Sequence, residues 1–531
     1  MSPGRSAGRA SRRYRPRVSE RVSSWLLGAL ALLLTVPAVL GIARVDQGLT
    51  RTTAEVGAVP VVVLTGDPSE RRPAVVVAHG FAGSAQLMDD LGVALAEAGY
   101  AVVLLDFSGH GRNPEPLPVS GRDVDAGVLD RELGAVVAWT RQQPWADPAR
   151  LGLLGHSMGA GAVVRYAVAD AQGARQVMAT VAVSLPSDSA VTTSDPAVPR
   201  DLLLLVGGNE LPQFTDAALG ALRAAYPDGE VGPGYGAPVD GTARAVQVVP
   251  RADHVSILFS TGTAQAAVDW FDESVGAPSS GHTVGGGRIG WLLLLTLGAA
   301  IGFVPLARLA FGPVRPASPA PVWWVVALVS LGSAVVASLV ARALPSVAER
   351  VPLAVGGHLV LWFAVAGLAS YAATKVLRIA RVAPLEVVAG FPWRDLVATF
   401  AMTSYAVVAL GLVAQRTWTA FSFAGGRERW LLLVELAFLA WFWADDRIVG
   451  RRWWLALITR AIAVVVLLGS VVVLGAPSFL TLLVPLMAVV LLLLLVYGQT
   501  VARRTSLPWA AALVQAIPLA YLVTTTFPLV S

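Results

Sequence analysis

The sequence predicts an α/β domain, with a mostly parallel sheet flanked by helices, followed by an all-α multi-span transmembrane domain. Two observations carry this prediction. Residues 44–286 alternate short β-branched runs with helical stretches, which is typical of a parallel sheet covered by helices on both faces. Residues 289–530 are a series of long apolar runs. The whole chain is only 14% charged, whereas soluble domains carry about 25% charged residues.

Four segments follow from this division. We expect an arginine-rich cytoplasmic tail over residues 1–24, a transmembrane anchor over 25–43, an extracytoplasmic domain over 44–286, and about eight transmembrane helices over 287–531. The basic balance of the chain comes from arginines beside apolar runs, so they indicate membrane topology and no nucleic-acid partner is expected. The chain has no cysteine, which excludes disulfides and thiolate metal sites.

The first apolar run predicts a membrane anchor. Trp25 to Ala43 is free of charged residues and approaches the length of about 20 residues that a spanning helix needs. An arginine-rich leader holds the amino terminus in the cytoplasm by the positive-inside rule. A signal peptide cleaved after Ala43 is the alternative, and both readings export the next domain. The leader arginines are Arg5, Arg9, Arg12, Arg13, Arg15, Arg17 and Arg21.

Eight further spans are expected in the carboxy-terminal half. They cover residues 289–310, 321–343, 352–374, 395–415, 429–446, 454–475, 478–500 and 508–528. With residues 44–286 outside, the inner loops hold eleven basic residues and the outer loops five, which agrees with the positive-inside rule. The sequence therefore predicts a multi-pass cell-membrane protein with a cytoplasmic amino terminus. Membrane lipids are its expected surroundings, and protein partners are not indicated.

Two ionisable residues lie inside these spans. Glu435 and Arg460 differ in expected depth by about 10 Å, from the helical rise of ~1.5 Å per residue, so direct pairing is not expected. Each is predicted to extend its charged end towards the nearer membrane surface.

The exported domain alternates strands and helices. The predicted strands are Val59–Leu64, Ala74–Ala78, Ala101–Leu105, Leu151–Leu154, Val177–Ser184, Leu202–Val206 and Ala245–Val249. The predicted helices cover 85–98, 125–142, 158–171, 213–226 and 262–275. Two strands therefore precede His79.

The pentapeptide Gly155-His156-Ser157-Met158-Gly159 lies between a strand and a helix. This context is typical of a nucleophile elbow, a sharp turn that exposes a serine hydroxyl above the sheet. A serine hydroxyl needs a base to remove its proton, and imidazole serves near neutral pH. His254 follows the last strand and is the candidate base. Glu210 and Asp253 are the candidate acids that would orient it.

Residues 75–113 and 151–161 strongly resemble the α/β-hydrolase superfamily. The stretch His79-Gly80-Phe81-Ala82-Gly83 resembles its oxyanion loop, and Asp106 to Arg112 resembles its D-x-x-G-H-G turn. The resemblance implies the chain order Ser157, Glu210, His254 for the triad. It also implies an oxyanion hole formed by the backbone N–H groups of Phe81 and Met158. His79, His110 and His156 are expected to orient loops.

The sequence predicts a membrane-bound serine hydrolase that cleaves carboxylic esters by a Ser-His-acid acyl-enzyme mechanism. A serine peptidase of the same fold is one alternative, and a transporter or sensor with a hydrolase-like binding domain is another. The short stretch Leu185–Arg200 implies an open site, which favours an accessible small-molecule or lipid ester. No motif for a metal or cofactor is visible, so none is expected.

Overall fold

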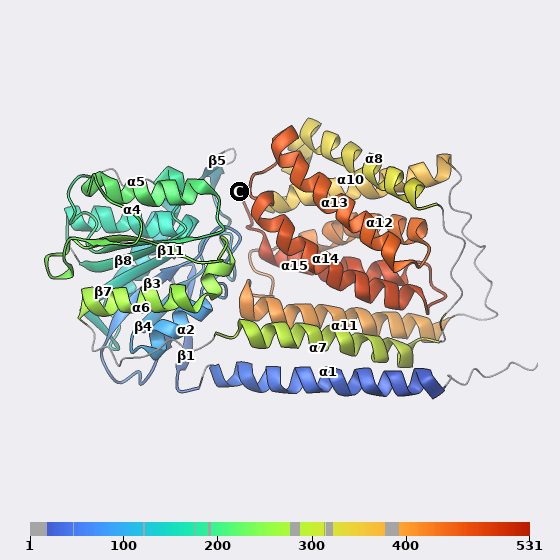
Figure 1. Ribbon diagram of the computed structural model, residues 1–531, viewed down its shortest axis with the longest axis horizontal. Coiled ribbons are helices and arrows are strands. Elements are labelled where there is room, and N and C mark those ends of the chain that lie inside the picture. The colour runs from blue at the N-terminus through green and yellow to red at the C-terminus, as the bar shows by residue number, and fades with distance from the viewer. Residues whose placement is uncertain are drawn as a thin grey trace, which may run out of the picture.

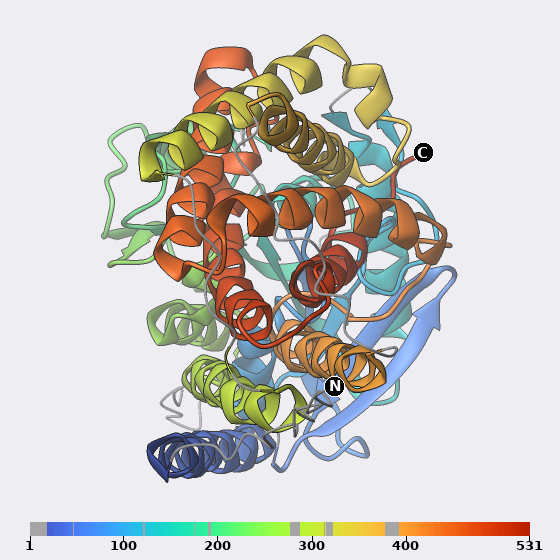
Figure 2. The same ribbon diagram turned by 90° about the vertical axis from the view of Figure 1, so that its right-hand side faces the viewer.

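The computed structural model describes residues 18–45, 47–120, 123–174, 176–189, 193–276, 287–312, 314, 322–377 and 392–531. A globular α/β domain lies at one end of a bundle of long helices (Figure 1). Figure 2 views the molecule from the other end of that bundle, with the sheet behind it. The leader arginines before Arg21 and the domain junction at residue 286 lie outside the described residues.

Nine strands form one sheet in the order β1-β2-β4-β3-β7-β8-β9-β11-β10. The six strands from β4 to β11 in this order are parallel, while β1, β2 and β10 pair antiparallel with their neighbours. Their bounds are β1 Thr50–Val56, β2 Val59–Thr65, β3 Arg72–Ala78, β4 Ala101–Leu105, β7 Ala146–His156, β8 Val177–Val183, β9 Leu202–Gly207, β10 Gly234–Tyr235 and β11 Arg244–Val249. A separate two-residue hairpin joins β5 Val119–Ser120 to β6 Asp123–Val124.

Helices cover both faces of the sheet. Along β3 the side chains alternate, because successive residues of a strand point to opposite faces. Val75 and Val77 belong to the core beneath α2 and α6, whereas Val76 and Ala78 belong to the core beneath α3 and α4. The helices are α2 Asp89–Glu97, α3 Ala126–Arg141, α4 Met158–Gln172, α5 Pro212–Ala225 and α6 Thr261–Val275, and three short 3-10 turns are η1 Ser187–Ser189, η2 Pro238–Asp240 and η3 Ser256–Phe259.

The predicted fold class is confirmed, and the sheet contains two strands that were not predicted, β1 and the two-residue β10. All seven predicted strands and five predicted helices form. β1, which the sequence analysis missed, pairs along its full length with β2, so three strands precede His79 instead of two. Its side chains are mostly exposed because it is an edge strand. An exposed edge strand lacks the apolar run by which the other strands were recognised.

The bundle consists of long helices that lie side by side. They are α1 Val18–Val45, α7 Ile289–Ala310, α8 Trp323–Ala343, α10 Ala354–Val376, α11 Trp393–Thr417, α12 Glu428–Val449, α13 Trp453–Leu474, α14 Leu480–Ala502 and α15 Ala510–Thr526, with the short α9 Pro345–Ala348 between α8 and α10. Within the described ranges, seven helices are long and apolar enough to cross a membrane. α12 and α15 are outside this count. α12 carries several charged residues, and α15 has only 17 residues.

Arg460 does not extend to a membrane surface, so that expectation is wrong. It is 2% exposed and forms a buried ion pair with Asp445. Its other amino group donates to Gln515 Oε1 at 3.0 Å, and the guanidinium lies over the ring of Trp441 at 4.7 Å. The counter-ion, Asp445, lies on helix α12, near the end of the predicted span 429–446. The charge is thus neutralised inside the bundle.

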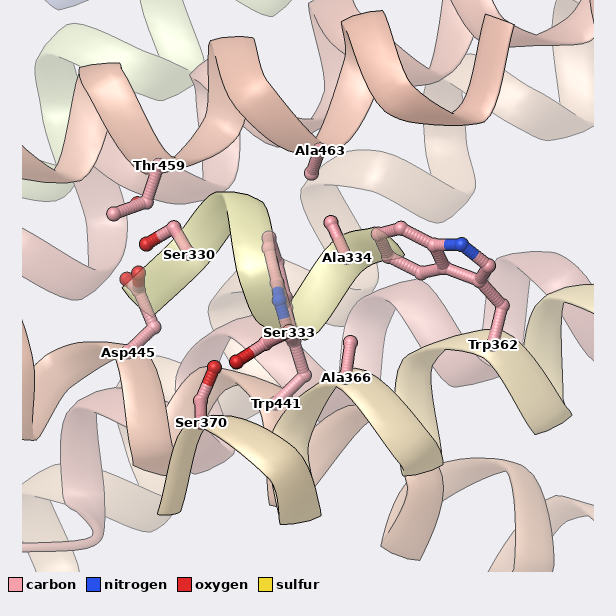
Figure 3. Close-up of a pocket in the computed structure, with 10 residues that line it drawn as sticks. All are labelled: Ser330, Ser333, Ala334, Trp362, Ala366, Ser370, Trp441, Asp445, Thr459 and Ala463. Carbon is pink, nitrogen blue, oxygen red and sulfur yellow. The ribbon is translucent and has the colours of Figure 1, made fainter. Parts of the chain in front are cut away.

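A small polar cavity adjoins this ion pair (Figure 3). In Figure 3 the hydroxyl groups of Ser333 and Ser370 point towards one another, and Asp445 lies beside Ser330. The lining residues are Ser330, Ser333, Ala334, Trp362, Ala366, Ser370, Trp441, Asp445, Thr459 and Ala463.

Candidate active site

Ser157 is the single residue between the end of β7 at His156 and the start of α4 at Met158. Its backbone has φ 53° and ψ −120°, a conformation that residues other than glycine rarely adopt. A Cβ at Gly155 would lie 2.3 Å from the Gly159 oxygen, and one at Gly159 would lie 2.4 Å from the Ala78 oxygen. Both flanking positions therefore require glycine. This geometry is the sharp elbow that the pentapeptide predicts.

His254 lies in the loop between β11 and η3, with its ring 97 positions along the chain from Ser157. Its Nε2 is 3.0 Å from Ser157 Oγ, which is within hydrogen-bond reach for proton transfer. The side chain is almost fully buried, and the centroids of the Phe214 ring and the imidazole are 4.5 Å apart. The packing holds the imidazole in a single orientation.

Glu210 follows β9 and completes the chain of hydrogen bonds. Its Oε1 is 2.6 Å from His254 Nδ1, and its Oε2 accepts the Gly207 N–H at 2.7 Å. The glutamate side chain is fully buried. An ionised carboxylate only accepts hydrogen bonds, so Nδ1 carries the proton and Nε2 is free to accept the serine proton. The extra methylene of glutamate, compared with aspartate, does not prevent contact.

Asp253, the competing candidate acid, has a different role. Its side chain is exposed, and its Oδ1 accepts the N–H groups of Val255 and Ser256 at 3.0 and 2.9 Å. These bonds close the turn that carries His254. The structure thus brings Ser157, His254 and Glu210 together and leaves Asp253 outside the group.

The loop 79–83, which we call the oxyanion loop, lies against the elbow. A Cβ at Gly80 would lie 3.1 Å from Ser157 Cβ and 2.8 Å from His156 Nδ1. No hydrogen bond among the described residues uses the N–H of Phe81 or of Met158. Both N–H groups are therefore available to a substrate oxygen, as an oxyanion hole requires.

The three remaining histidines of this region bind backbone groups. His79 donates from Nδ1 to the Gly80 carbonyl at 2.8 Å and accepts the Phe107 N–H on Nε2 at 3.0 Å. His110 donates from Nδ1 to the Ser108 carbonyl at 2.8 Å. Burial lowers the pKa of each imidazole, and for His110 and His156 the pKa lies well below its usual value. All three are neutral near pH 7 and orient loops.

Asp106 fixes the turn after β4. Its Oδ1 accepts the Ala85 N–H at 2.7 Å and its Oδ2 accepts the Arg112 N–H at 2.9 Å. Its own carbonyl accepts a bond from the Asn113 side chain at 2.9 Å. The turn 106–113, which we call the DxxGHG turn, is thereby tied to the segment after the oxyanion loop.

Sequence reasoning missed several residues around this site. His156 was expected to orient a loop, but its partner, the His254 carbonyl that accepts from its Nε2 at 2.9 Å, has no local sequence signal. Three bundle residues, Trp418, Arg427 and Phe479, contact the oxyanion loop or the DxxGHG turn. Within the described ranges, no group of three His, Cys, Asp or Glu residues is placed to share a metal ion.

Residues 69–205 match the family model of a hydrolase family described as serine aminopeptidase, S33. Among curated proteins, an uncharacterised protein of Mycobacterium tuberculosis is 38% identical over 96 residues, which is 18% of this chain and 32% of that protein. An uncharacterised protein of Escherichia coli, encoded in the traX-finO intergenic region, is 32% identical over 101 residues, or 19% and 34% of the two chains. The chain thus spans about a third of the length of these relatives.

Three solved structures cover a larger share of this chain, from 42% to 50%. A dienelactone hydrolase of Anabaena variabilis is 21% identical with a TM-score of 0.30, covering 42% of this chain and 98% of its own. A bacterial membrane phospholipase A is 18% identical with a TM-score of 0.33, covering 50% and 100%. The dipeptidyl peptidase 4 of Porphyromonas gingivalis is 16% identical with a TM-score of 0.32, covering 42% and 35%. Likenesses at these values carry no information about the reaction.

Proposed function

Because the globular domain is an α/β hydrolase, we propose that the protein is a membrane-bound serine hydrolase that cleaves carboxylic esters. One observation carries the proposal: an unbroken hydrogen-bond chain runs from Ser157 Oγ through His254 to Glu210, with links of 3.0 and 2.6 Å. Three side chains from distant stretches meet in the arrangement that activates a serine. A packing role alone does not need this order of donor and acceptor.

The proposed reaction proceeds in two halves. Ser157 Oγ attacks the ester carbonyl carbon while its proton passes to His254 Nε2, and the carbonyl oxygen becomes an oxyanion bound by the N–H groups of Phe81 and Met158. Collapse breaks the carbon–oxygen bond to the alcohol, which leaves with the proton from Nε2. Water then attacks the acyl carbon while its proton passes to His254 Nε2. The bond between this carbon and Ser157 Oγ breaks, Oγ takes the proton from Nε2, and the free acid is released. Glu210 stabilises the imidazolium in both halves.

The proposed location is the outer face of the cell membrane. The bundle residues that contact the domain lie in the segments 418–427, 475–479 and 527–531, at one end of the bundle. These are the segments that the charge pattern assigns to the outer side. Helix α1 also contacts α7 closely, since a Cβ at Gly41 would meet the Trp291 ring at 2.3 Å. This close fit supports retention of α1 as an anchor.

Labelling of the membrane-inserted protein with a fluorophosphonate probe tests the proposal. The probe forms a covalent bond to an activated serine, so we expect one label per wild-type chain and none on Ser157→Ala. The wild type should also hydrolyse p-nitrophenyl esters, with turnover extending beyond the acetate. Labelling that persists in Ser157→Ala would remove this serine from the mechanism. A wild type that neither labels nor hydrolyses would favour a transporter or sensor role for the chain.

The family description favours a second candidate, a serine aminopeptidase. The same three side chains serve amide hydrolysis, and the difference lies in recognition of a free amino terminus. Aminoacyl p-nitroanilides with free and acetylated amino groups separate the candidates. Faster turnover of the p-nitroanilides that have a free amino group than of esters of equal size would support the peptidase and contradict the esterase.

A further inference from the structure

The bundle holds the oxyanion loop directly. We propose that Trp418 and Phe479, at the domain-facing end of the bundle, are positioning residues that place the Phe81 N–H for catalysis. Ester hydrolysis then requires the assembled bundle as well as the globular domain. The inference rests on the proposed function, because it assigns a role to the same site.

Trp418 forms two hydrogen bonds with the loop region in opposite directions. It directly follows α11, and its indole N–H donates to the Ala82 carbonyl at 2.9 Å. The Ser84 hydroxyl donates to the Trp418 carbonyl at 2.8 Å. Ala82 has φ 57°, a conformation that a non-glycine residue holds only when its surroundings impose it. The indole bond therefore restrains the residue immediately after Phe81.

Phe479 restrains Phe81 itself. Phe479 immediately precedes α14, and its ring makes an edge-to-face contact with the Phe81 ring at 5.1 Å between centroids. Phe81 also makes an edge-to-face contact with His110, whose ring centroid lies 5.8 Å away. The Phe81 side chain packs against the core of the bundle as well as the core of the domain. The residue that would supply an oxyanion N–H is thus held between the two parts.

The DxxGHG turn, which carries His110, is held by the bundle too. Arg427 is fully buried and donates to the carbonyls of Gly109 and Gly111, at 3.2 Å for Gly111. Burial lowers its pKa to about 10, so it remains a cation at neutral pH. The Leu529 N–H donates to the same Gly109 carbonyl at 2.9 Å, and the Leu529 carbonyl accepts the Leu117 N–H at 2.7 Å. The support behind Phe81 therefore also depends on the bundle.

These contacts matter for catalysis because turnover depends on the exact position of the oxyanion donors. Oxyanion donors must lie about 2.7–3.1 Å from the developing charge, and loss of one donor costs about 100- to 1000-fold in turnover. A misplacement of about 1 Å can cost on the order of 100-fold. Within the oxyanion loop itself, one backbone hydrogen bond, from the Gly83 N–H to the Gly80 carbonyl at 3.0 Å, closes the turn. Phe81 and Ala82 are therefore restrained by Phe479 and Trp418 of the bundle in addition to their contacts within the domain.

Two variants of the full-length protein test the inference. Trp418→Phe keeps an aromatic ring and removes the indole N–H, while Phe479→Leu keeps an apolar side chain and removes the aromatic edge. Trp323→Phe is the matched control, because Trp323 is exposed at the opposite end of the bundle. Exhaustive fluorophosphonate labelling counts competent sites, so that kcat is expressed per labelled serine. The substrate is p-nitrophenyl butyrate, and a trifluoromethyl ketone serves as transition-state analogue.

We expect kcat per site to fall about tenfold or more in Trp418→Phe and Phe479→Leu, with KM changed less than about twofold. The inhibition constant of the ketone should rise by a similar factor, because its hemiketal oxygen occupies the oxyanion hole. Unchanged kcat per site and unchanged ketone affinity in both variants, with or without a lower melting temperature, would overturn the inference while leaving the proposed function intact. A wild type without labelling or turnover would overturn both.

Discussion

The imidazole of His156 donates to the carbonyl oxygen of His254 at 2.9 Å, so the residue before the nucleophile holds the loop of the candidate base. The two rings lie 4.8 Å apart. Nucleophile and base are therefore linked twice, once through the Ser157 hydroxyl and once through this bond. The second link restrains the backbone of His254 relative to the elbow that carries Ser157.

Replacement of His156 by phenylalanine should lower turnover more than binding. The variant keeps a ring of similar size but leaves the buried His254 carbonyl without its donor, which costs about 1–3 kcal/mol. We expect kcat to fall about tenfold with little change in KM, since the misplacement affects the base and not the substrate. Steady-state kinetics per fluorophosphonate-labelled site measure this. Turnover equal to that of the wild type would show that the loop of His254 is held by its other contacts.

Glu210→Gln and Asp253→Asn should have very different effects on turnover. The glutamine variant lacks the charge that stabilises the imidazolium, so its turnover should fall about 1000-fold or more. The asparagine variant retains the oxygen that accepts the N–H groups of Val255 and Ser256, so its turnover should stay within about twofold of the wild type. Both variants are compared by hydrolysis of the same p-nitrophenyl ester. An equal loss in the two would mean that the contact of Glu210 with His254 does not orient the base.

Asp201 should make stability depend on pH. Burial raises its pKa from 3.8 to about 7, so the folded protein keeps a proton that the unfolded chain releases near pH 4. Stability is therefore greatest below pH 4 as far as this group is concerned, and it falls as pH rises to about 7. Asp201→Asn has no proton to lose, so its melting temperature relative to the wild type should increase over this range.

The control for this measurement is the exposed Asp216, replaced in the same way. The melting temperature of Asp216→Asn relative to that of the wild type should be nearly constant between pH 4 and pH 8. Thermal unfolding of each protein is followed by tryptophan fluorescence at several pH values. If the melting temperature of Asp201→Asn relative to the wild type were also constant, the carboxyl group of Asp201 would be ionised in the folded protein.

Removal of either partner of the Asp445–Arg460 pair should destabilise the bundle strongly. Asp445→Asn leaves a buried guanidinium without its counter-ion, and such a loss costs about 3–5 kcal/mol. The double variant Asp445→Asn, Arg460→Met removes both charges and should recover much of that loss. Thermal unfolding of the two single variants and the double variant in detergent gives the coupling between the two sites. Additive losses would indicate that the charges do not interact.

Much of the domain could be predicted from local sequence patterns. β4 forms at the predicted bounds Ala101–Leu105 because an apolar run flanked by turn residues specifies a buried strand. Glu210 was identified from its place after β9, and the structure brings it to His254 although 44 positions separate them. β1 was missed because its exposed residues lack a hydrophobic pattern. Edge strands are specified by their pairing partner as much as by their own sequence.

The contacts between the two parts of the chain could not be predicted. Trp418 and Ala82 are 336 positions apart, and neither belongs to a motif that indicates the other. The same holds for Arg460, whose partner Asp445 lies one helix earlier. The comparison of membrane depths considered only Glu435 as a partner for Arg460, rejected that pair, and did not consider Asp445 at the end of α12. Pairing between helices depends on their relative rotation and offset, which local periodicity does not determine.

Residues 529–531 follow every helix of the bundle in chain order, yet they bind beside the DxxGHG turn of a domain that is synthesised long before them. Translation proceeds from the amino terminus, and domains generally begin to fold in that order. The turn next to the nucleophile's loop therefore gains its last backbone partners, the Leu529 N–H and carbonyl, only after α15 has been made. The support of this turn is in this way delayed until the helices of the bundle have been made.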